Sequence, residues 1–181
     1  MDGAKIPPIE LRNVQITFRN FSGKPTRFDT QGGRRNFCIL LDDETAKKLE
    51  DEQWKVKYLK PREEGDTPQA YMQVKVAYNE WYTPSINVIA GDKMKQLNED
   101  TVDTVDSLDI EFCDMTLNGR WFENADGNKG YSAYLKEIFI HVAISRLAQE
   151  YAKKYQEEIE DNYVDCGHVC NGDCSSCPEN V

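Results

Sequence analysis

The last 16 residues of this 181-residue chain hold a group of side chains that could bind a metal ion. Four cysteines and one histidine fall within 12 residues: Cys166, His168, Cys170, Cys174 and Cys177. Thiolates and imidazole are the ligands of tetrahedral zinc sites, but the spacing differs from that of a zinc finger, whose ligand pairs are separated by a longer loop. Three alternatives therefore stay open, namely zinc, free thiols in an unstructured tail, and disulfides or an iron–sulfur cluster.

A second group of residues interleaves aromatic rings with cations. Residues 11–41 hold six Lys and Arg against one acidic residue, and further Trp, Tyr and Lys residues follow up to Lys75. Single-stranded nucleic acid requires this combination, because bases stack on rings and phosphates need a cationic groove. The alternative is a solvated basic surface over aromatic core residues. Alternation along the chain assigns Phe18 and Phe37 to the core, and Phe28, Trp54 and Tyr71 to an exposed face.

The elements that must position these residues are mostly β-strands, because apolar residues recur at every second position in short segments. Such segments suggest a sandwich or a small barrel, and they lie at 14–19, 35–41, 54–59, 71–78, 86–90, 108–117 and 131–142. Asp42 precedes the helical pattern of Ala46 and Leu49 and predicts an N-capped short helix. A further helical turn is expected near residues 100–106.

The composition indicates one domain followed by a helix and a tail. We predict a nucleic-acid-binding domain over 1–143, an amphipathic helix over 144–161 that docks through its apolar stripe, and a flexible, acidic, Cys-rich tail over 162–181. The net charge of −10 excludes a globally basic nucleic-acid binder. No apolar run is long enough for a membrane span and the N-terminus has no signal core, so we expect a cytoplasmic protein without a membrane partner.

Catalytic patterns are weak in this sequence, and we expect no enzyme activity. His141 is the one histidine before the tail, and no nucleophile elbow surrounds it. Gly32-Gly33 is not followed by the Lys-Ser/Thr pair of a phosphate-binding loop. The acidic residues between Asp100 and Asp114 fit a solvated face better than a metal cluster.

Five blocks of the chain resemble the single-stranded DNA-binding proteins of tailed bacteriophages. They are RNFCILLD (35–42), WKVK (54–57), KPREEGD (60–66), AYMQVKVAY (70–78) and YSAYLK (131–136). The resemblance spans roughly residues 6–143 and implies an OB-type barrel that coats DNA strands without sequence readout during replication or recombination. Members of that family often have acidic tails that compete with DNA and recruit replisome partners, and the cysteines of this tail depart from that pattern.

We therefore predict a mainly β fold, an OB-type small barrel with a short inserted helix and a C-terminal amphipathic helix, that binds single-stranded DNA in the host cell. The residues predicted to follow the DNA backbone are Arg19, Arg27, Arg34, Arg35, Lys57, Lys60, Arg62 and Lys75. The rings predicted to stack on bases are Phe28, Trp54, Tyr71, Trp81 and Tyr134. No cofactor is required, zinc in the tail is an option, and replication or recombination proteins and further copies of the chain are candidate partners.

The rival interpretation is a non-catalytic OB or sandwich module whose Trp81-Tyr82 loop docks a replication, recombination or host defence protein. A third is a zinc-dependent regulator that acts through the tail. Convergence of the cations from 11–41 and 54–62 on one groove would favour DNA, whereas scattered cations beside one apolar patch would favour a protein partner.

Overall fold

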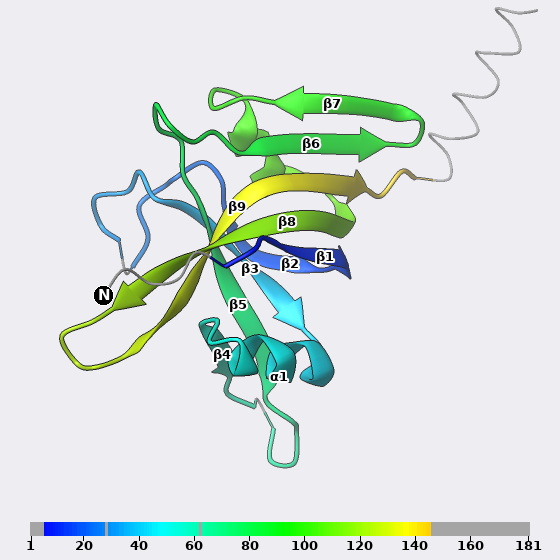
Figure 1. The fold of residues 1–181 in the computed structure, drawn as a ribbon. Helices are drawn as coiled ribbons and strands as arrows, with labels where there is room; N and C mark the ends of the chain where they lie inside the picture. The colour runs from blue at the N-terminus through cyan, green and yellow to red at the C-terminus, as the bar shows by residue number, and fades with distance from the viewer. Residues whose placement is uncertain (1–5, 28, 62, 146–181) are drawn as a thin grey trace, which may run out of the picture. The chain divides into compact units, whose positions relative to one another are not determined.

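The computed structural model describes residues 6–27, 29–61 and 63–145, and these fold as a nine-stranded mixed β-sheet with two short helices (Figure 1). The strands are β1 (Ile9–Val14), β2 (Ile16–Asn20), β3 (Arg35–Leu41), β4 (Val56–Leu59), β5 (Gln69–Val76), β6 (Ser85–Ala90), β7 (Lys93–Leu97), β8 (Ile110–Glu123) and β9 (Lys129–Val142). The helices are α1 (Asp43–Asp51) and the 3₁₀-helix η1 (Val102–Ser107). Neither helix in this part of the chain is long and apolar enough to cross a membrane.

The sheet curls until its two ends meet. Its hydrogen-bonded path runs β1-β8-β9-β5-β3-β2, with β4 beside β5 and the β6–β7 hairpin beside β9. The end strands β1 and β2 are consecutive in the chain and are separated by Gln15 alone. The Gln15 carbonyl extends the pairing of β2 with β3, since it accepts a hydrogen bond of 3.0 Å from the Leu40 amide. The barrel is therefore not closed by a continuous strand ladder, as in the partly open OB-fold.

The mainly β fold predicted from the sequence is confirmed. Residues 9–20 serve as one bent first strand, which pairs with β8 through β1 and with β3 through β2. In the order of an OB barrel, β3 and β5 are then the second and third strands, and β8 and β9 are the fourth and fifth. The pairing of β5 with β9 is parallel, whereas the other pairs of the barrel are antiparallel.

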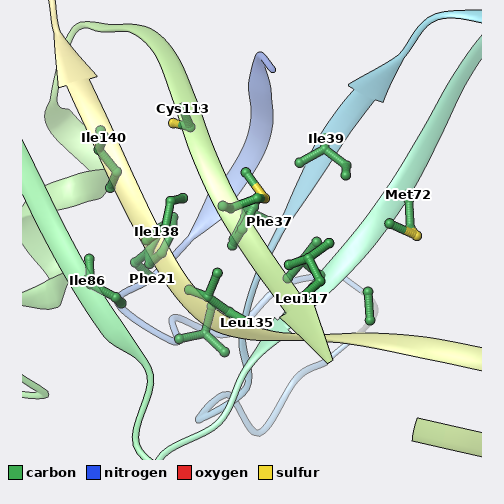
Figure 2. Close-up of a cluster of buried hydrophobic side chains, with 14 of the residues drawn as sticks. Phe21, Phe37, Ile39, Met72, Ile86, Cys113, Leu117, Leu135, Ile138 and Ile140 are labelled. Carbon is green, nitrogen blue, oxygen red and sulfur yellow. The ribbon is translucent and has the colours of Figure 1, made fainter. Parts of the chain in front are cut away.

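The barrel interior is filled by side chains from all the main strands (Figure 2). Phe21 and Phe37 are both fully buried and stack with their ring centroids 5.1 Å apart. On β5 the predicted alternation is confirmed, because Met72, Val74 and Val76 are buried while the residues between them face outward. The described residues up to Ala143 form one compact unit.

The prediction that Phe18 lies in the core is wrong, because the β2–β3 register shifts between Thr17 and Asn20. Phe18 has a positive φ of 48° and is 62% exposed. A residue in the left-handed region interrupts the alternation of a strand and inserts a bulge. Phe21, which the pattern did not single out, takes the place in the core instead.

Helix α1 confirms the predicted short helix. The Asp42 carboxylate accepts hydrogen bonds from both the backbone N and the Oγ1 of Thr45, each at 2.8 Å. These bonds hold the pKa of Asp42 below its usual range. Ala46 and Leu49 turn into the core as predicted, and η1 confirms the helical turn expected near 100–106. Strands β1 and β7 were not predicted in full, because β7 (KMKQL) exposes four of its five residues and carries little pattern.

Candidate nucleic-acid interface

The outer side of β5 carries a ring and a cation four residues apart. Tyr71 and Lys75 point away from the core, as the alternation predicted. In the ladder Tyr71 lies opposite Lys57 of β4 on one side and Leu40 of β3 on the other. Residues directly opposite on neighbouring strands share a face, so Lys57 and Tyr71 lie next to each other on the outer surface.

Lys75 continues this surface onto β9 and β8. It pairs with Tyr134 of β9, and its Nζ lies 5.2 Å from the centre of the Tyr134 ring. The Arg120 guanidinium of β8 lies 5.9 Å from the same ring. Tyr134 thus holds two cations by cation–π attraction. We define the outer face as Lys57, Tyr71, Lys75, Tyr134 and Arg120, which come from four neighbouring strands.

The turn between β5 and β6 projects the most exposed large ring among the described residues. Trp81 is 92% exposed, at the tip of a turn closed by reciprocal backbone hydrogen bonds between Asn79 and Tyr82 of 2.9 and 3.2 Å. The Trp81 amide donates to Asn79 Oδ1 at 3.0 Å. The Tyr82 hydroxyl donates to the carbonyl of Leu135, and its partial burial raises its pKa. The turn is therefore tied to β9.

The basic loop over residues 22–34 is held at its base by η1. The Asp106 carboxylate accepts hydrogen bonds from the backbone amides of Phe21 (2.8 Å) and Ser22 (3.0 Å). Beyond this anchor Lys24, Arg27 and Arg34 are exposed, and Arg34 makes one ion pair of 3.7 Å with Asp29. The loop projects from the same side of the barrel as the Trp81 turn (Figure 1).

Two of the predicted backbone-tracking arginines are engaged within the protein. The Arg19 guanidinium donates to the carbonyls of Val105 (3.0 Å) and Leu108 (2.7 Å), and so fastens β2 to η1. Arg35 forms an ion pair of 3.0 Å with Glu99, and its guanidinium lies over the Tyr78 ring at 5.2 Å. The structure gives both residues contacts within the protein, and their assignment to the DNA path stays a prediction.

Trp54 was predicted to face outward, and this is wrong, because it is 4% exposed. Its ring packs 6.0 Å from that of Tyr131 and reaches the backbone of Gly119, where a Cβ atom would lie 3.0 Å from Trp54 Cη2. The end of α1 and the start of β9 enclose it, since the Tyr131 amide donates to the Gln53 carbonyl at 2.8 Å. A period-two pattern cannot reveal this burial, because it depends on a glycine 65 residues away.

The remaining predicted residues divide between the outer surface and the undescribed segments. Lys60 is exposed just beyond β4. Phe28, Arg62 and the five predicted metal ligands lie outside the described residues, as do the helix predicted over 144–161, apart from its first two residues, and the tail. Within the described part of the chain no group of three or more His, Cys, Asp or Glu side chains is placed to hold a metal ion.

Sequence reasoning missed Arg120, Asn118 and Cys38. Arg120 precedes two aromatic residues, Trp121 and Phe122, and the cation-ring pattern used elsewhere could have found it. Asn118 carried no signal, since its place beside Tyr134 follows from the β8–β9 register. Cys38 is 7% exposed, and because it alternates with Phe37 and Ile39 it lies on the outer side of the sheet, opposite Gln73. Burial raises the pKa of its thiol, and Lys57 partly offsets this effect.

A comparison with known protein families shows the family of this chain. The model of the putative phage ssDNA-binding domain family matches residues 3–171. The chain belongs to this family. The resemblance to phage single-stranded DNA-binding proteins that the residue blocks indicated is thereby confirmed.

Solved structures of one phage protein are similar to this chain. They are the single-stranded DNA-binding protein from bacteriophage Enc34 with a C-terminal truncation (14% identity, 76% of this chain and 87% of that chain covered, TM-score 0.49) and the same protein in complex with ssDNA (14%, 76% and 88%, 0.47). A further structure of that protein shows 13% identity over 76% and 82%, with a TM-score of 0.46. No curated protein sequence matches the chain.

Proposed function

We propose that this member of the phage ssDNA-binding family binds single-stranded DNA across the outer face, without reading its sequence, and protects it during phage replication and recombination. The observation that carries the proposal is the continuity of Lys57, Tyr71, Lys75, Tyr134 and Arg120 across β4, β5, β9 and β8. Of these strands, β5 is the third strand of the OB order, and OB-folds bind oligonucleotides on the face of their second and third strands.

The chemistry of the outer face matches the needs of a single strand. Lys75 and Arg120 lie over the Tyr134 ring in the absence of DNA, and both can form ion pairs with phosphates when a strand binds. Tyr71 then offers a stacking surface that every base can use, because each base has a π-face. The exposed cations of the basic loop, Arg27 and Arg34, extend the positive surface beyond the sheet.

We also propose that the protein acts without catalysis, in the cytoplasm of the infected host cell, with single-stranded DNA as its first partner. Replication or recombination proteins and further copies of the chain are secondary partners. Zinc binding by the cysteines of residues 166–177 remains a separate prediction.

The experiment is fluorescence anisotropy of labelled oligo-dT of about 30 nucleotides, longer than the 4–16 that one OB-fold covers, at two salt concentrations and with a duplex control. We expect tight binding to the single strand, with log K falling by about 0.7 per log unit of salt for each phosphate neutralised. Absence of binding at low salt would refute the proposal and favour a protein partner for the Trp81 turn.

Tyr71→Ala separates stacking from charge in the same assay. We expect weaker binding by about 1 kcal/mol or more with an unchanged salt slope, because a ring is lost and no phosphate contact is lost. Tyr71→Phe is the matched control and should bind nearly as the natural chain does. A reduced salt slope in Tyr71→Ala would contradict the role assigned to the ring.

A further inference from the structure

A hollow of about 420 Å³ lies where the Trp81 turn meets β8 and β9. Its lining includes Asn79, Trp81, Asn118, Arg120 and Tyr134. The volume falls at the lower end of the range of small-molecule sites. With Tyr82, which also lines the hollow, three rings, two amides and one guanidinium border a space of the size that small ligands occupy.

The turn that forms one wall of this hollow is fixed before any ligand arrives. Reciprocal backbone bonds join Asn79 and Tyr82, and the Asn79 side chain caps the Trp81 amide. The Tyr82 hydroxyl, bonded to the Leu135 carbonyl, anchors the turn to β9. Trp81 therefore keeps its ring exposed on a rigid support, and little ordering is needed when a ligand stacks on it.

The polar groups at the hollow fit the edge and the phosphate of a nucleotide. Asn118 Nδ2 donates to the Tyr82 hydroxyl at 3.3 Å, which leaves the amide oxygen and one N–H for another partner. Each of the four bases has neighbouring donor and acceptor atoms that an amide can match. Arg120 is exposed and lies 5.9 Å from the centre of the Tyr134 ring, so it is placed to bind the phosphate.

We propose that this hollow takes one unstacked nucleobase of a bound single strand, stacked on Trp81, with Asn118 at its polar edge and Arg120 at its phosphate. The inference rests on the proposed function and adds a discrete anchor to it. The other nucleotides of the strand can move along the open outer face, whereas one nucleotide per protein is held in a preformed pocket. Since the amide suits every base, the anchor does not create sequence specificity.

Photo-crosslinking tests the anchor directly. Oligo-dT carrying 5-iodouracil is bound to the full chain and irradiated, and the crosslinked residues are mapped by mass spectrometry. We expect crosslinks at Trp81, because Tyr134 also belongs to the outer face and a crosslink there alone would not reveal the anchor. Crosslinks confined to other residues, with oligo-dT still bound by anisotropy, would overturn the anchor and leave the proposed function standing. Failure of the oligonucleotide to bind at all would overturn both.

Substitutions of Trp81 measure how much the anchor contributes to the affinity for DNA. We expect Trp81→Ala to raise Kd for oligo-dT by about 5- to 150-fold, the range for loss of one stacked base, and Trp81→Phe to restore most of the affinity. The matched control is Tyr58→Ala, because Tyr58 is also exposed, at 49%, but lies near the acidic residues Asp43 and Glu50. Equal effects of Trp81→Ala and Tyr58→Ala would overturn the inference.

Discussion

Arg34 and Arg35 are neighbours in the sequence with different surroundings in the fold. The Arg34 side chain is 82% exposed, and its single ion pair with Asp29 is long, at 3.7 Å. The Arg35 side chain is 22% exposed, bonded to Glu99 and packed over Tyr78. The burial of Tyr78, which raises the pKa of its hydroxyl, belongs to the same cluster. Charge alone could not distinguish the two arginines.

Arg34→Ala should therefore change DNA binding, whereas Arg35→Ala should change the stability of the fold. Arg34→Ala should reduce the salt slope of DNA binding by about 0.7 and change the free energy of unfolding by less than about 0.5 kcal/mol. Arg35→Ala should leave the salt slope unchanged and lower the free energy of unfolding by about 1 kcal/mol, because an ion pair and a cation–π contact are lost. Salt-dependent anisotropy and urea unfolding measure both. An equal loss of slope would mean that Arg35 leaves Glu99 for a phosphate.

At the scale of elements, α1 depends on its first residue. Asp42 lies outside the helix and satisfies the Thr45 amide, which has no partner within the helix. Asp43 and Glu44 add negative charge to the first turn, where the helix dipole favours it. The helix end then places Gln53 and Trp54 against β9, so the cap also supports the wall of the barrel.

We expect Asp42→Ala to lower the free energy of unfolding by about 0.5–2 kcal/mol at neutral pH. The folded pKa of Asp42 is lowered from 3.8, so its stabilising contribution is complete above that pH and is lost as pH falls through the folded value. Urea unfolding at neutral and acidic pH should show the variant and the natural chain converging in acid. A constant difference across this pH range would show that the charge of Asp42 has no part in the cap.

The start of β9 requires a glycine at position 130, because a side chain there would meet the backbone of Gln53. A Cβ atom at Gly130 would lie 2.6 Å from the carbonyl oxygen of Gln53, and that backbone is fixed by the bond from the Tyr131 amide. At Gly119 a Cβ atom would lie 2.5 Å from Cδ1 of Ile6, the end of a side chain that can rotate, and 3.0 Å from the Trp54 ring.

Gly130→Ala should therefore be more harmful than Gly119→Ala. We expect Gly130→Ala to lower the free energy of unfolding by roughly 1–3 kcal/mol, because the clash is with backbone, and Gly119→Ala to cost less. Thermal unfolding followed by circular dichroism ranks the two variants. The reverse order would show that the Trp54 ring, rather than the Gln53 backbone, is the rigid neighbour.

For the whole molecule, the sheet separates two cysteines that the sequence treats alike. Cys113 is fully buried in the core, and burial together with the nearby Asp114 carboxylate raises its pKa to about 12. Cys38 is nearly buried on the outer surface, opposite Gln73 and near Lys57. The two thiols therefore report on different events, Cys113 on unfolding of the barrel and Cys38 on occupation of its outer face.

Alkylation followed by peptide mapping should resolve these events residue by residue. At pH 8 we expect Cys113 to react only when the chain unfolds, because its thiol stays protonated and is inaccessible. Cys38 should react slowly in the free protein and more slowly still with oligo-dT bound. Above pH 9 the raised pKa of Cys113 favours unfolding, since the unfolded thiol ionises first. Cys38 reactivity unaffected by DNA would place the strand on another surface.

The amino-acid pattern was enough to predict the mainly β class, the capped helix at Asp42 and the outward-facing residues of β5, because these follow from local periodicity and local hydrogen bonding. It also determined the family, through blocks spread over the chain. Which cations and rings are exposed depends instead on contacts between segments that are distant in the chain. Arg35 pairs with Glu99 and Trp54 packs against Gly119, 64 and 65 residues away, while Arg120 joins Lys75 at Tyr134 through pairing of distant strands. Pairwise contacts across a curled sheet are set by register, and no local pattern records the register between distant strands.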